Sequence, residues 1–67
     1  MLNRYWEIRV YRAYKYKNSL TDDRLMEQRK LYYEPSDDDI FDAIADNNGD
    51  FAEVVIKYEV TRVQKNG

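Results

Sequence analysis

The chain has 67 residues, of which 13 are acidic and 11 are basic, so its length allows one small domain, residues 1–67, with a formal net charge of −2 at pH 7. It contains no cysteine and no histidine, which removes disulfides, thiolate metal sites and the commonest general base, and we expect a protein that is not an enzyme and uses no cofactor or metal. No apolar run exceeds four residues and no signal peptide is evident, so we expect a cytoplasmic protein without membrane contact.

The first predicted element is a long β-strand over residues 4–17, in which Trp6, Ile8 and Val10 alternate with polar and aromatic residues. Residues 18–28 allow two interpretations, a loop or a short helical turn over 24–28. The aromatic content of residues 29–34 predicts a second strand, with Met26 as an alternative start and Pro35 as its end.

A helix is predicted over residues 37–47. Ser36 is a good N-cap residue, and Asp39 stands three positions after it, as in a capping box. Asn48-Gly49 suits a left-handed turn at the other end. The expected apolar stripe consists of Ile40, Phe41, Ile44 and Ala45.

Residues 52–60 alternate again and predict the last strand. The order strand, strand, helix, strand predicts an α+β fold, in which a three-stranded antiparallel or mixed sheet of spatial order 2-1-3 carries one helix on one face. The expected core consists of Trp6, Ile8, Val10, Phe41, Ile44, Val54, Ile56 and Tyr58. A chain this short buries little apolar surface, so we expect a homodimer that forms through the uncovered sheet face or through the edge of the second or third strand.

Charge is segregated along the chain. Residues 1–33 have a balance of +4, residues 34–67 have a balance of −6, and residues 34–53 hold eight carboxylates without any lysine or arginine. Within this segment Asp38, Asp42 and Asp46 follow one side of the predicted helix. One interpretation is a solvated helix face, and the other is a ridge that imitates a phosphate backbone and attracts basic protein surfaces.

Two polar segments allow other interpretations. Residues 46–53 resemble a calcium loop, but Gly49 is fourth and Glu53 eighth, whereas that loop needs them sixth and twelfth. Residues 11–17 interleave tyrosines with cations, as nucleic-acid-binding sheets do, but the glycine-bearing motif of such sheets is missing. We therefore expect neither a metal site nor direct binding of nucleic acid.

Residues 31–63 resemble the small dimeric, DNA-mimicking uracil-DNA glycosylase inhibitors of Bacillus phages. The resemblance lies in Tyr32-Tyr33-Glu34, in Phe41-Asp42 on the helix and in residues 52–57 of the last strand. It implies that Asp42 contacts the enzyme, although Ala45 stands where the family has an aromatic residue. The ending over residues 58–63 is similar to the last strand of a small coliphage inhibitor of host RNA polymerase.

The resulting hypothesis is an inhibitor that blocks the basic DNA-binding groove of a host enzyme, with uracil-DNA glycosylase as the first target and RNA polymerase as an alternative. A structural or assembly protein is the other alternative. The predicted partner-binding residues are Glu34, Asp38, Asp39, Phe41, Asp42 and Asp46.

Overall fold

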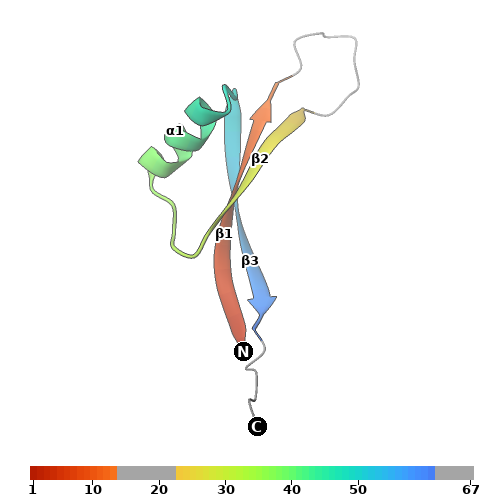
Figure 1. Cartoon of the computed structure of the whole chain (residues 1–67), viewed down its shortest axis with the longest axis vertical. Coiled ribbons are helices and arrows are strands. Elements are labelled where there is room, and N and C mark those ends of the chain that lie inside the picture. Colours follow the sequence, from red (N-terminus) through yellow and green to blue (C-terminus); the bar gives the residue numbers. More distant parts are fainter. Residues whose placement is uncertain (14–22, 62–67) are drawn as a thin grey trace.

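The computed structural model describes residues 1–13 and 23–61. Its elements are β1 (Leu2–Arg12), β2 (Arg24–Leu31), α1 (Asp37–Asp46) and β3 (Phe51–Val60) (Figure 1). The strands form one antiparallel sheet in the order β2-β1-β3, and α1 lies on one face of it (Figure 1). The predicted α+β fold and strand order are thereby confirmed. Most of the predicted continuation of the first strand beyond Arg12 lies outside the described residues.

The second strand begins and ends earlier than predicted. Residues 24–28 belong to β2, so a helical turn there is wrong, whereas residues 18–22 fall outside the described part of the chain. Pairing with β1 sets these bounds, because Arg24 lies opposite Arg12 and Leu31 opposite Trp6. The register shifts between Val10 and Tyr11, which leaves Met26 as an extra residue that packs against the core.

The core is smaller than predicted. Ile8, Val10 and Ala43 are the fully buried side chains of the described residues. The partly buried residues around them are Met26, Leu31, Ile40, Ile44 and Ala52. Four predicted core residues are exposed instead, namely Phe41, Val54, Ile56 and Tyr58. For the residues of the last strand the reason is length: the 10 residues of α1 span about 15 Å, while the 11 residues of β1 span about 36 Å, so the helix covers only one half of the sheet. Phe41 is exposed because it lies on the outer face of α1.

The start of α1 forms as predicted. The Asp39 backbone N–H donates to Ser36 Oγ at 3.2 Å, and the Ser36 backbone N–H donates to Asp39 Oδ2 at 2.9 Å, which completes a capping box. At the other end Arg12 donates to the carbonyl oxygens of Asn47 and Asn48, at 3.5 and 3.2 Å. This contact places a positive charge at the negative end of the helix dipole.

The predicted apolar stripe of α1 is wrong in two of its four positions. Ala43 is buried and Phe41 is 66% exposed, so the face toward the sheet consists of Ile40, Ala43 and Ile44. A small side chain at position 43 lets the helix lie close to Ile8 and Val10. Ala45 is exposed as well, on the outer face.

Candidate partner-binding surface

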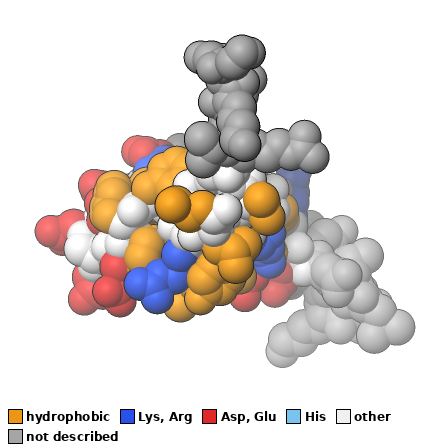
Figure 2. All heavy atoms as spheres, turned by 90° about the horizontal axis from the view of Figure 1, so that it is seen from below, with side chains coloured by type: hydrophobic (Ala, Val, Ile, Leu, Met, Phe, Trp, Pro, Cys, Tyr) orange, Lys and Arg blue, Asp and Glu red, His pale blue; other side chains and the backbone are white. Residues whose placement is uncertain are grey.

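The outer face of α1 carries two carboxylates one turn apart, with an aromatic ring beside them. Asp38, Phe41 and Asp42 are all exposed and lie at positions i, i+3 and i+4, which share one side of a helix. Asp38 and Asp42 form no hydrogen bond or ion pair with any residue of the described ranges. We call these three residues the acidic helix face. In Figure 2 the acidic side chains gather at the side of the molecule that carries α1.

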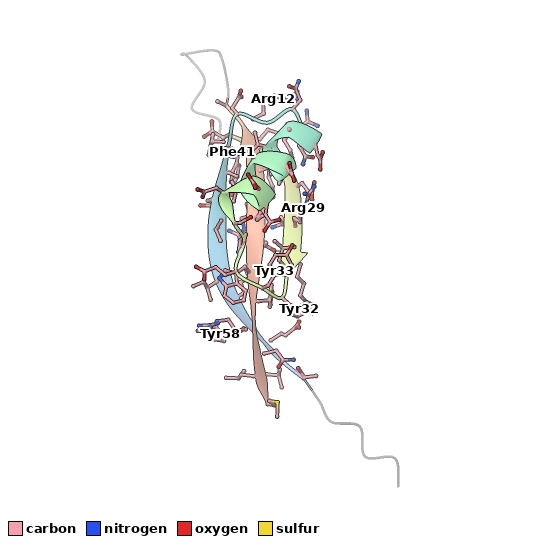
Figure 3. The ribbon with its side chains drawn as sticks, turned by 90° about the vertical axis from the view of Figure 1, so that its left-hand side faces the viewer. Arg12, Arg29, Tyr32, Tyr33, Phe41 and Tyr58 are labelled. Carbon is pink, nitrogen blue, oxygen red and sulfur yellow. The ribbon has the colours of Figure 1, made fainter. Side chains whose placement is uncertain are left out.

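Two other predicted site residues have structural roles. The Asp39 carboxylate is held in the capping box with Ser36. Asp46 forms an ion pair with Arg29 of β2, at 3.1 Å between Oδ2 and Nη2, on the side of α1 away from Phe41 (Figure 3). Two of the three aspartates predicted to form a line are therefore exposed carboxylates without a partner in the described ranges. The negative charge of the third is offset by an arginine of the amino-terminal half.

Glu27 of β2 provides a second link between the strand and the helix. Asn47 Nδ2, at the end of α1, donates to the Glu27 carboxylate at 2.6 Å, and Arg29 Nε, within β2, donates to the same carboxylate at 2.7 Å. These hydrogen bonds, first that of Arg29 and then that of Asn47, lower the pKa of Glu27 below its ordinary value of 4.5. The two carboxylates in turn raise the pKa of Arg29. This cluster links the C-terminal end of α1 to β2.

Glu34 lies in the connection between β2 and α1, where it is exposed. Tyr32 and Tyr33 precede it and are 61% and 55% exposed. Tyr32 turns to the face opposite α1, where its hydroxyl donates to Glu59 at 2.8 Å, whereas Tyr33 forms no hydrogen bond within the described ranges. Figure 3 shows Tyr33 below the helix, so Tyr33 extends the exposed surface from α1 toward the uncovered half of the sheet, and Glu34 is the exposed residue that follows it in the chain. Sequence reasoning did not select Tyr33, although an aromatic residue just after a strand was its signal.

The sheet face opposite α1 consists of paired charges and stacked rings. Glu7 contacts Arg9 at 2.6 Å and Lys57 at 3.6 Å, and the hydrogen bond from Arg9 is the main cause that lowers the pKa of Glu7. Tyr11 stacks on Phe51 with ring centroids 5.3 Å apart. The cations on this face are therefore engaged by carboxylates of the same chain, and a nucleic acid would have to displace them. Residues 14–17 of the tyrosine- and lysine-rich segment lie outside the described part.

The half of the helix-side face that α1 leaves uncovered is apolar. Leu2, Ile56, Tyr58 and Val60 are 66%, 53%, 62% and 72% exposed. Arg4 covers the neighbouring Trp6, with its guanidinium carbon 5.1 Å from the ring centroid. Hydrophobic side chains also lie in the middle of the end seen in Figure 2, and Figure 3 shows Tyr58 well below α1.

Within residues 1–13 and 23–61, no three acidic side chains come close enough together to hold a metal ion. Over the same ranges no helix has the length and hydrophobicity to cross a membrane. Comparison with models of protein families, with curated proteins and with solved structures gives no match to this chain.

Proposed function

We propose that this protein is a binding module that inhibits a nucleic-acid enzyme by placing its acidic helix face in the enzyme's basic DNA-binding groove. The observation that carries the proposal is the arrangement of Asp38, Phe41 and Asp42, in which two exposed carboxylates one turn apart lie beside an exposed ring. Aromatic residues are enriched in contact surfaces between proteins, and exposed carboxylates beside such a residue attract a basic partner surface. Blocking a groove requires no catalytic group, which agrees with the absence of histidine and cysteine.

The electrostatics of the chain favour a basic partner. Four basic residues of the sheet form ion pairs within the chain, namely Arg29 with Asp46, Arg9 with Glu7, Lys30 with Glu59 and Lys57 with Glu7. The acidic helix face has no such partner in the described part of the chain, so its charge is available to another molecule. A carboxylate pair on a rigid, capped helix attracts Lys- and Arg-lined surfaces and repels nucleic acid.

Uracil-DNA glycosylase is the first target to test, because residues 31–63 resemble inhibitors of that enzyme and Asp42 stands at the acidic position. Asp46 contributes less than its sequence position indicates, because Arg29 holds it, and Asp39 contributes less because the cap holds it. Glu34 and Tyr33 extend the contact beyond the first turn of the helix.

The experiment measures inhibition of purified uracil-DNA glycosylase, and separately of bacterial RNA polymerase, by the unmodified chain and two variants. Asp42→Asn and Gln28→Lys each change the net charge by +1, but Gln28 is an exposed residue of β2 away from the acidic helix face. We expect Asp42→Asn to weaken inhibition by about 5- to 30-fold at low salt, which corresponds to about 1–2 kcal/mol. Gln28→Lys should stay within about twofold.

Salt provides the second measurement. The difference between the unmodified chain and Asp42→Asn should shrink as ionic strength rises to about 1 M, where charges are screened within about 3 Å. Equal losses in the two variants would show that only net charge matters and would overturn the assigned surface. Absence of inhibition of both enzymes would overturn the proposed target class.

A further inference from the structure

The outer edge of β3 is a long, regular and unpaired strand edge. Within the described ranges β3 pairs only with β1, and its ten residues pair without a register shift. The edge strand on the other side of the sheet is β2. It has an irregularity opposite Val10 and four charged residues among its eight, and both features disfavour pairing with a further strand. β3 has three charged residues among ten and no proline.

The N–H and C=O groups of successive β3 residues point alternately toward β1 and toward the outer edge, so odd and even residue numbers separate the two sets. Thr61 donates its N–H to Met1 O at 2.9 Å, and the register Leu2–Val60 places these two residues directly opposite each other. Hydrogen-bonded and non-hydrogen-bonded pairs alternate in an antiparallel ladder. The odd-numbered residues of β3 therefore bond to β1, and the even-numbered ones, such as Val54 and Ile56, direct their N–H and C=O groups outward.

The side chains beside the outward backbone groups are apolar and exposed. They are Val54, Ile56, Tyr58 and Val60, with exposures of 40%, 53%, 62% and 72%. Together they leave on the order of 400 Å² of apolar surface, about half of the ~800 Å² that each partner contributes to a standard interface. An added strand would bury the backbone edge as well.

We propose that a second copy of this chain pairs with β3, antiparallel and about a two-fold axis at Val55, so that the dimer has one six-stranded sheet. The charges of β3 select this occupant and this register. About Val55, Glu53 of each copy lies opposite Lys57 of the other copy, and Val54 lies opposite Ile56. Opposite charges and apolar pairs at facing positions both stabilise a strand pair.

Neighbouring registers are less favourable. An axis at Ile56 would place Glu53 opposite Glu59 twice, and an axis at Lys57 would place Lys57 opposite itself. An axis at Tyr58 would pair Lys57 with Glu59, but over only about five residues of β3 instead of nine. Glu59 is held by Lys30 at 2.7 Å. Glu53 and Lys57 also have partners within their own chain, Tyr11 and Arg9 for Glu53 and Glu7 for Lys57, but their side chains are still 50% and 37% exposed, so each can face a further charge.

The proposed register also gives the half of the sheet that α1 leaves uncovered a neighbour in the dimer. Antiparallel pairing about Val55 places the half of one copy that carries Tyr58 beside the half of the other copy that carries α1. The apolar residues that one helix is too short to cover thus lie next to the partner's covered half. The acidic helix face is a different surface from the β3 edge, so loss of one interaction leaves the other measurable.

The test uses cysteine, which the chain lacks. Val55→Cys creates two thiols across the axis in a non-hydrogen-bonded pair, where Cα atoms lie about 4.5 Å apart, within disulfide range. Tyr58→Cys is the matched control, because its two thiols would lie about 20 Å apart, six residues along the ladder. We expect Val55→Cys to give a disulfide-linked dimer under mild oxidation at micromolar concentration, and Tyr58→Cys to remain mostly uncrosslinked.

Sedimentation equilibrium of the chain without cysteine is the second measurement. We expect the mass of two chains, and the mass of one chain for Ile56→Lys, with the strand signal of circular dichroism retained because Ile56 is more than half exposed in the single chain. The mass of one chain for the unmodified protein at 100 μM would overturn the proposal. Preferential crosslinking of Tyr58→Cys would overturn the register.

Discussion

Gly49 lies where the chain leaves α1 and approaches β1. Its N–H donates to Ile44 O at 2.9 Å, and a Cβ atom built on it would overlap Cγ1 of Val10 and lie 3.2 Å from the carbonyl oxygen of Tyr11. Val10 is completely buried and Tyr11 O is backbone, so neither neighbour can move away cheaply. The glycine is required by this close approach and not by its own backbone angles, since the left-handed residue of the turn is Asn48, with φ 50°.

Gly49→Ala should therefore lower the free energy of unfolding by about 1–3 kcal/mol, the usual cost of overpacking a well-packed site. Denaturation in urea measures this difference. Asn48→Gly is the control, because a glycine accepts the left-handed angle without the Cβ penalty, and its stability should stay within about 0.5 kcal/mol. A Gly49→Ala chain as stable as the parent would show that the turn relaxes away from β1.

The contacts of single side chains explain why the acidic residues of α1 differ in their availability to a partner. Asp38 and Asp39 are adjacent, yet Asp39 accepts the N–H and Oγ–H of Ser36 whereas Asp38 is exposed. The distance of each aspartate from the N-cap residue decides which one is held in the capping box, and this distance can be counted in the sequence. The ion pair between Asp46 and Arg29 joins residues 17 positions apart and depends on where β2 lies under the helix, so spacing along the chain could not reveal it.

At the scale of elements, the cap of α1 gives a direct prediction. Ser36→Ala removes the acceptor for the Asp39 N–H and should lower the free energy of unfolding by about 1 kcal/mol. Thermal unfolding followed by circular dichroism is the measurement. Asp38→Asn, which leaves the capping box intact, should change stability much less, and equal losses in the two variants would mean that the cap hydrogen bond has no special role.

The strands and the helix could be predicted because their patterns are strong. Alternation over residues 4–12 and 52–60 and the Ser36–Asp39 pair identified three of the four elements closely. The bounds of β2 could not be predicted in the same way, because its charged residues have weak strand preference and pairing with β1 overrides that preference. The orientation of α1 also depends on packing. Either Phe41 or Ala43 could share the sheet-facing side of the helix with Ile40 and Ile44. Only the limited space above Ile8 and Val10 places Ala43 there instead of Phe41.

At the scale of the whole molecule, buried apolar surface is small and carboxylate contacts matter for holding the parts together. Glu27 joins β2 to the end of α1 through Arg29 and Asn47, and Glu59 joins β3 to β2 through Lys30. Hydrogen bonds lower the pKa of both carboxylates in the folded chain, chiefly those from Arg29 for Glu27 and from Lys30 for Glu59. Such groups bind fewer protons when folded than when unfolded, so their contribution is complete above pH ~4.5 and is lost as the pH falls through their folded pKa.

Thermal stability should therefore decrease as the pH is lowered from 5 toward 3, and part of that decrease should depend on Glu27. Glu27→Gln removes the titrating group, so we expect a lower melting temperature at pH 7 and a shallower decrease below pH 5 than in the parent chain. Asp38→Asn is the reference for the loss of one negative charge, because Asp38 has no hydrogen-bond or ion-pair partner among residues 1–13 and 23–61. If Glu27→Gln retains the full acid dependence, the attachment of α1 to β2 does not rest on this carboxylate, and the apolar contacts of Ile40, Ala43 and Ile44 must hold the helix by themselves.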